Sequence, residues 1–151
     1  MSWTCDSCGQ IIRNAQDGWV EWLVRMSPEG GSLYAHSLRL VHRRPSSPSP
    51  AGCQYNGQQV YAQNSDIIAD QGLEFFTSYD GHMELLEMVS RQEFQNPEEV
   101  LEMIKRLHIP NYEIARPYVQ QAVQQGVIEL NAKPGYEYQD QLTAVRRWAG
   151  V

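Results

Sequence analysis

The sequence predicts an α+β fold, with a small β module followed by a mostly helical domain. Runs of aromatic and β-branched residues dominate the first third of the chain, and apolar residues at helical spacing dominate after residue 66. A Cys-x-x-Cys-Gly motif near the start is the third observation. At 151 residues, the chain is long enough for two small domains. We expect a β module over residues 1–60 and a helical domain over residues 61–151.

The segment Cys5-Asp6-Ser7-Cys8-Gly9 is typical of a zinc knuckle. Both thiolates must point at one ion while the backbone folds tightly, and the glycine tolerates a positive φ. His42 and Cys53 are the candidate third and fourth ligands, which gives a tetrahedral set. His36 competes with His42, which we prefer because it is nearer to Cys53. We therefore expect Cys5, Cys8, His42 and Cys53 to hold one structural Zn²⁺ ion.

Two strands are expected between the cysteine motif and Cys53. Trp19–Val24 is rich in aromatic and β-branched residues, and Leu38–His42 alternates between two faces. A turn over residues 27–31 separates them, so they form an antiparallel pair. The segment Arg43–Pro50 contains three prolines, which exclude a helix and a central strand. We interpret it as a solvated loop, and a basic finger for an anionic partner is the alternative.

Several helices are expected after a linker over residues 54–65. Residues 67–76 read as one or two short helices, and Asp80 caps another that extends to Gln92, with Leu85, Leu86 and Val89 facing inward. Asn96-Pro97-Glu98-Glu99 is the clearest helix start, with Asn96 as N-cap and Glu99 completing a capping box. The apolar stripe of this helix is predicted to be Val100, Leu101, Ile104 and Leu107.

The sequence then predicts a helix over residues 112–125, which is kinked by Pro117 and ends at Gly126. A β-hairpin over residues 127–138 and a helix over residues 140–149 follow. The order over residues 97–138 resembles a winged helix. The resemblance implies cations on the second helix and the wing of DNA-binding members, where this chain offers Arg116 and Lys133. Through Cys5, Cys8, His42 and Cys53, the N-terminal half resembles small zinc-ribbon proteins.

Charge separates the function classes. The net charge is −6, with five basic and four acidic residues over 1–65 (+1) and seven and fourteen over 66–151 (−7). The acidic half should repel phosphate backbones and present Glu98, Glu99 and Glu102 to a basic patch of a partner.

We therefore expect a non-enzymatic protein-interaction or regulatory module with a protein partner. One alternative is a nucleic-acid-binding transcriptional regulator of the winged-helix type, favoured by Arg43-Arg44 and Arg146-Arg147. The other is a zinc-dependent enzyme, which requires an open coordination position in place of Cys53.

The expected location is the cytoplasm. The first residues carry no basic region followed by an apolar run, and no stretch reaches the roughly 20 apolar residues of a membrane span. Three cysteines are an odd number for a disulfide framework, which favours thiolates in a reducing compartment. No membrane partner is expected, and the sequence leaves the oligomeric state open.

Overall fold

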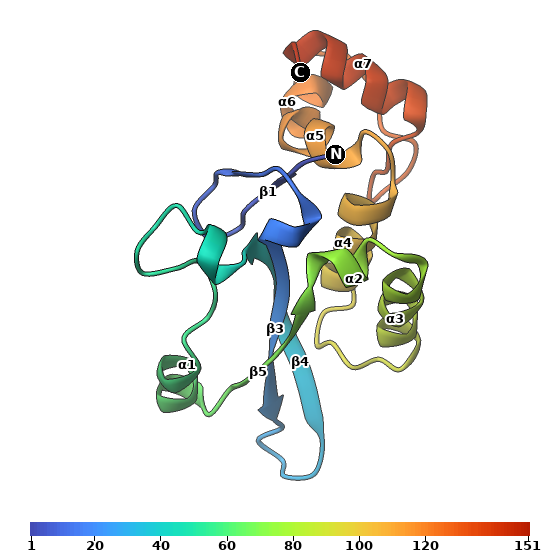
Figure 1. Ribbon diagram of the computed structural model, residues 1–151. Helices are drawn as coiled ribbons and strands as arrows, with labels where there is room; N and C mark the ends of the chain where they lie inside the picture. Colours follow the sequence, from blue (N-terminus) through green and yellow to red (C-terminus); the bar gives the residue numbers. More distant parts are fainter. The chain divides into compact units, whose positions relative to one another are not determined.

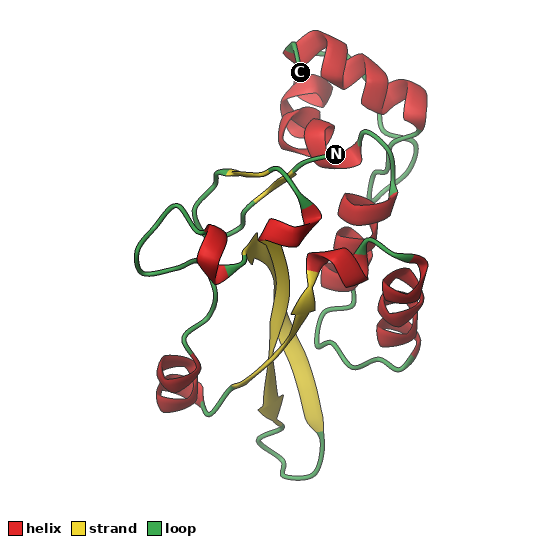
Figure 2. Ribbon diagram, in the orientation of Figure 1, coloured by secondary structure: helices red, strands yellow, loops and turns green.

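The computed structural model describes residues 1–151 and confirms the α+β fold (Figure 2). The chain divides into two compact units, Met1–Leu107 and His108–Val151. The boundary expected at residue 60 therefore differs from the observed one and lies inside the first unit, in α1 (Gly57–Asn64). The reason is that the strand after α1 joins the sheet of the β module (Figure 1).

Two antiparallel sheets form the β part of the first unit. β1 (Trp3–Thr4) pairs with β2 (Ile11–Ile12), and a second sheet has the strand order β4-β3-β5. Its strands are β3 (Gly18–Met26), β4 (Leu33–His42) and β5 (Ile67–Gly72). The expected antiparallel pair of the first two is confirmed. Between the pairs Glu21–Arg39 and Leu23–His36, a β-bulge places Ser37 at a φ of 58°.

Residues 67–72, predicted to be helical, form a strand. Ile67-Ile68 begins β5, which pairs with β3 along its whole length. The local pattern is ambiguous because Asp70 and Gln71 interrupt the apolar run, so pairing with β3 decides the structure. α2 (Leu73–Phe76) follows directly, and its Phe76 packs edge-on against Trp22 in the core.

Short helices flank this sheet: η1 (Ala15–Asp17), η2 (Arg44–Ser46) and α3 (Tyr79–Ser90). Ser78, and not Asp80, caps α3, because the Ser78 hydroxyl accepts a bond from the N–H of Gly81. Leu85 is buried as expected. Met88 takes the inward position predicted for Leu86, which is exposed.

α4 (Glu98–His108) begins where the sequence predicts, and the side chain of Asn96 accepts a hydrogen bond from the N–H of Glu98. The carboxylate of Glu99, predicted to complete a capping box with Asn96, instead accepts the N–H of Leu38 in β4. The buried face also differs from the predicted stripe: Leu101 and Ile104 are half-buried. The buried residues of α4 are Val100, Met103, Arg106 and Leu107.

The second unit contains α5 (Tyr112–Ala115), η3 (Arg116–Tyr118), α6 (Val119–Gln124) and α7 (Gln139–Ala149). The helix predicted over residues 112–125 is thus interrupted by η3, which contains Pro117, at the position where the sequence predicts a kink. Leu142 and Val145 of α7 are buried, as expected.

The β-hairpin predicted over residues 127–138 is wrong, because this segment contains no strand. Val127, Ile128 and Leu130 pack against the helices instead of pairing across a hairpin. The side chain of Asn131 donates to the carbonyl oxygen of Tyr136 and closes the loop. Without a wing, the winged-helix expectation loses its defining element.

Candidate metal centre

The knuckle is a tight turn between β1 and β2. The N–H of Cys5 donates to the carbonyl oxygen of Gln10, and the N–H of Gly9 donates to that of Cys5, both at 2.9 Å. Gly9 has a φ of 75°. A side chain is disfavoured at this angle, which is the physical reason for a glycine after Cys8.

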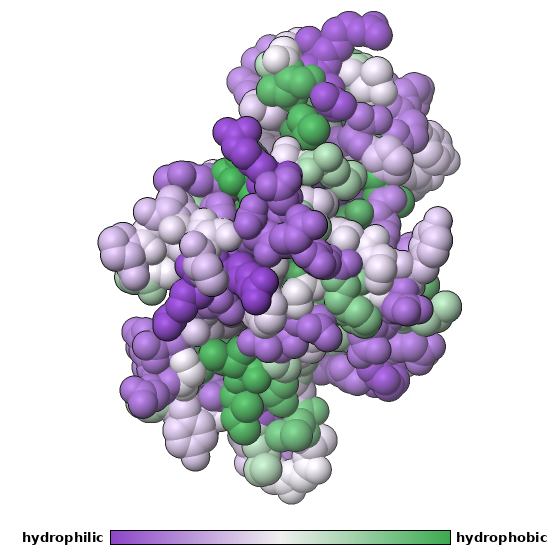
Figure 3. Space-filling model, in the orientation of Figure 1, coloured by the Kyte–Doolittle hydropathy of each residue, from purple (hydrophilic) through white to green (hydrophobic).

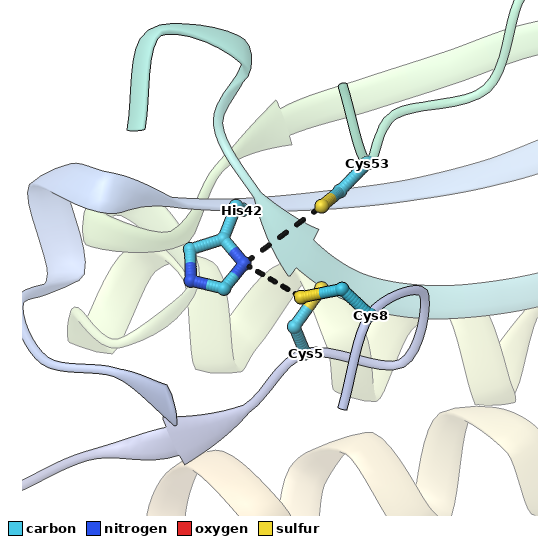
Figure 4. A group of neighbouring side chains, drawn as sticks. All are labelled: Cys5, Cys8, His42 and Cys53. Carbon is cyan, nitrogen blue, oxygen red and sulfur yellow. Dashed lines mark hydrogen bonds between the residues drawn. The ribbon is translucent and has the colours of Figure 1, made fainter. Parts of the chain in front are cut away.

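The structure brings together all four residues that the sequence singles out as ligands (Figure 4). The sulfur atoms of Cys5, Cys8 and Cys53 and a ring nitrogen of His42 lie within 4.8 Å of one another. Nδ1 of His42 is 3.4 Å from Sγ of Cys8 and 3.9 Å from Sγ of Cys53. A tetrahedral zinc ion separates its sulfur and nitrogen ligands by about 3.6 Å. The observed distances bracket this value, so the cluster could hold a metal ion.

The ring of His42 is oriented by β2. Its Nε2 lies 3.2 Å from the carbonyl oxygen of Ile11, which can only accept a hydrogen bond. Nε2 therefore carries the proton, and Nδ1 presents its lone pair to the three sulfurs. This is the arrangement by which metal-binding histidines are usually fixed.

The electrostatics of the cluster favour a cation. Burial raises the pKa of the Cys5 thiol, but N–H donors of Cys8, His42 and Ser7 outweigh it and lower the pKa to about 7. Burial raises the pKa of Cys8 to about 11, and the sulfurs of Cys5 and Cys53 contribute to this. Several thiolates at this separation repel one another, and a bound divalent ion offsets that repulsion.

Asp6 attaches the knuckle to β4 and α4. Its N–H donates to the carbonyl oxygen of Leu40, and its carboxylate accepts the N–H of Leu40 at 2.8 Å. Arg106 donates to the same carboxylate at 2.8 and 3.1 Å and to the carbonyl oxygen of Thr4. Arg106 does not stand out in the sequence as part of this site, and its position on the same helical face as Met103 is the local signal of its burial.

A second network positions Cys53. Arg39 donates to the carbonyl oxygen of Cys53 at 2.9 Å and to the carboxylate of Glu21 at 2.7 Å. Its guanidinium lies 3.6 Å from the ring centre of Tyr55, whose N–H also donates to Glu21. The hydroxyl of Ser47 lies 3.1 Å from the sulfur of Cys53. Glu21 is fully buried, and this network holds the chain on both sides of the fourth ligand.

His36, the competing histidine, lies in a different cluster. Its Nε2 is 3.0 Å from the buried carboxylate of Asp66, to which Arg25 also donates two hydrogen bonds. His42 is therefore the histidine beside the three cysteines.

Comparisons with protein-family models, curated proteins and solved structures found no match for this chain. No helix is long and apolar enough to cross a membrane.

Proposed function

We propose that Cys5, Cys8, His42 and Cys53 bind one structural zinc ion in a non-enzymatic protein-interaction or regulatory module. The observation that carries this proposal is the convergence of four protein ligand atoms within 4.8 Å. Structural zinc sites take four protein ligands, whereas catalytic sites keep one position for water or substrate. The presence of Cys53 in the cluster therefore favours a structural ion over a zinc-dependent enzyme.

The donor set supports zinc as the metal. Three thiolates and one imidazole suit zinc, whereas calcium and magnesium prefer oxygen ligands. All three cysteines are free of disulfides, which fits a reducing compartment such as the cytoplasm. In this role the ion joins three separate segments: the knuckle, the end of β4 and the loop that follows it.

Charge supports a protein partner over nucleic acid. The first unit contains eight basic and fourteen acidic residues, a net charge of −6, and the second contains four of each. Arg13, Arg43 and Arg44 are exposed and make no ion pair, and they are the observation that favours nucleic acid as the second candidate. Three phosphate contacts would lose only roughly 40-fold in affinity between 50 and 200 mM salt, against the 1,000-fold or more typical of strong binders. That number of contacts supports at most loose binding.

The acidic surface expected on α4 is smaller than the sequence predicts. Glu98 is exposed, but Glu99 is half-buried and bonds to Leu38 of β4. Glu102 is also half-buried and has an interaction partner. The partner surface is therefore better sought elsewhere on the first unit.

Recovery of a complex from cells, with the full-length protein as bait, tests the proposed function. We expect a protein that survives nuclease treatment and rebinds the bait when both are purified. Cys8→Ser should lose the metal and the partner, whereas Ser7→Ala, a change between the two cysteines, should retain both. A complex that dissociates on nuclease treatment would instead support nucleic-acid binding as the function.

A further inference from the structure

The two edges of the three-stranded sheet differ in how their main-chain groups are satisfied. Along the outer edge of β4, Ala35 exchanges hydrogen bonds of 2.7 and 2.8 Å with Glu93 and Gln95. The N–H groups of Leu38 and Leu40 donate to carboxylates at 2.9 and 2.8 Å. This edge is therefore covered by other parts of the same chain.

The main-chain groups along the outer edge of β5 have no such hydrogen-bond partners, although α1 contacts this strand. In an antiparallel strand, every second residue directs its N–H and C=O away from the neighbouring strand. Apart from its pairing with β3, the only main-chain bond within β5 is a local one, from the N–H of Gly72 to the side chain of Gln71. Ile67, Asp70 and Gln71 are exposed.

Apart from the exposed charge of Asp70, β5 also lacks most features that usually protect a free edge. It contains no proline or lysine, and its register with β3 runs from Val24–Ile67 to Trp19–Gly72 without a bulge. Natural edge strands commonly carry one of these features, because an open edge can pair with another chain. An unprotected edge on a sheet whose other edge is covered indicates a place for one more strand.

One face of the sheet is apolar and bare beside this edge. The pairs Val24–Ile67 and Met26–Leu33 lie on the same face as Trp22, because paired residues share a face and strands alternate. At the Trp22 end, this face is covered by Phe76 and Phe94.

At the other end of that face, Met26 and Leu33 are 63% exposed and Ile67 is 61% exposed. Figure 3 shows hydrophobic side chains gathered over the lower part of the sheet. A strand added beside β5 would extend this face and shelter its exposed apolar residues.

We propose that the free edge of β5 is the docking site for an extended segment of a partner protein, which adds to the sheet as a fourth strand. This inference rests on the proposed interaction function and specifies its partner. Main-chain hydrogen bonds supply affinity in this mode, and alternate side chains supply specificity. The segment matches the six residues of β5, with apolar side chains on the Ile67 face. Asp70 on the other face is exposed and forms no ion pair, so it selects a lysine or arginine opposite it.

A second copy of this chain fits the edge less well. When two copies of β5 pair antiparallel, a two-fold axis relates them. Their apolar faces lie on the same side of the joined sheet only when this axis passes through a residue and not between two residues. Centred on Ala69, the pairing places Asp70 opposite Ile68 of the other copy, and centred on Asp70, it places two carboxylates opposite each other. Centred on Ile68, it pairs only residues 67–69 of β5 and brings Asp70 opposite Asp66. These arrangements are unfavourable.

Selection from a phage-displayed library of random 12-residue peptides, against the full-length metal-bound protein, tests the proposal. We expect binders with apolar residues at every second position and a cation on the other face. Hydrogen exchange should show protection within residues 67–72 on binding. Two forms of a selected peptide, one N-methylated at odd-numbered residues and one at even-numbered residues, should then be compared. We expect one form to lose binding and the other to keep it, because only half of the peptide N–H groups face β5.

Matched variants locate the site. Ile67→Lys should weaken peptide binding at least tenfold, whereas Leu86→Lys, which alters an exposed aliphatic residue of α3, should not change it. Should Ile67→Lys fail to fold, the exchange and N-methylation results still decide the question. Failure to select any peptide, protection of a different surface, or equal binding by both N-methylated forms would overturn the strand-addition site.

Two further outcomes separate this site from the function on which it rests. A dimer that forms as concentration rises, and that Ile67→Lys abolishes, would assign the edge to a second copy and overturn the proposed partner segment. A reconstituted partner complex that Ile67→Lys leaves intact would remove this site but keep the interaction function. Failure to recover any partner protein would count against both.

Discussion

Carboxylates of the first unit hold their positions through specific partners. Glu21 is paired with Arg39, and Asp66 with Arg25 and His36. Asp6 is paired with Arg106, whose guanidinium is buried. Removing one member of a buried pair leaves the other charge uncompensated, which is costly. Asp6 and Glu21 each accept a hydrogen bond from a main-chain N–H group, of Leu40 and Tyr55, two residues from His42 and Cys53 respectively.

Asp66 gives a prediction for the pH dependence of stability. Its hydrogen bonds from Arg25, with the nearby His36, outweigh burial and lower its pKa below the ordinary 3.8. Its stabilising contribution is therefore complete above pH of about 4 and is lost as the pH falls through the lower, folded-state pKa.

Unfolding free energies of the parent and Asp66→Asn, measured from about pH 6 to pH 3, test this. We expect the difference between the two proteins to stay constant at the upper end and to shrink at the lower end. Because both proteins share the metal ligands, acid-induced metal loss affects them alike. A difference that grows as the pH falls would contradict the assigned direction.

The clustering of the four candidate ligands was predictable from the sequence, and the contacts that position them were not. Cys5, Cys8, His42 and Cys53 stand out because thiol and imidazole groups at knuckle spacing have few other uses in a reduced protein. Arg106 and Asp6 are 100 residues apart in sequence. No local pattern connects such a pair, because their contact depends on how α4 packs beneath the knuckle.

At the scale of elements, α4 shows which part of a helix its own sequence determines. The start of α4 follows local chemistry, since Asn96 caps it as predicted. The buried face is determined by the surroundings. Met103 is only 2% exposed, whereas Leu101, on the predicted stripe, is half-buried. The stripe was misplaced because a methionine and an arginine occupy buried positions that a hydrophobic count gives to leucine and isoleucine.

Substitutions in α4 test this assignment. Met103→Ala should destabilise the protein by about 2–5 kcal/mol, because it leaves a cavity in the core. Leu101→Ala should cost less, since solvent already reaches that side chain. Chemical denaturation of both variants gives the comparison. If Leu101→Ala proved the more damaging, the buried face of α4 would be the one that the sequence predicts.

β5 and the segment 127–138 show where local patterns mislead. Residues 67–72 form a strand because each of them pairs with a residue of β3. The apolar residues of 127–138 lose the predicted hairpin because Ile128 and its neighbours are buried against the helices of the second unit. In both cases tertiary contacts outweigh local propensity.

The whole molecule consists of two units with separate hydrophobic clusters. The sequence correctly suggests a β-rich first part and a mostly helical second part, but it places the boundary at the change in composition near residue 60. The two compact units meet after Leu107, at the last residue of α4, because β5, α2, α3 and nearly all of α4 belong to the first unit. The cluster of Cys5, Cys8, His42 and Cys53 lies entirely within that unit and brings together segments of its first 53 residues.

The metal content of the full-length protein, purified without chelator, tests the central claim most directly. We predict about one zinc ion per chain. Its X-ray absorption spectrum should fit three sulfur ligands at about 2.3 Å and one nitrogen ligand at about 2.0–2.1 Å. His42→Ala should lose the metal, whereas His36→Ala, which removes the competing histidine, should keep it. Folded parent protein without zinc, or zinc retained by His42→Ala and lost by His36→Ala, would contradict the account.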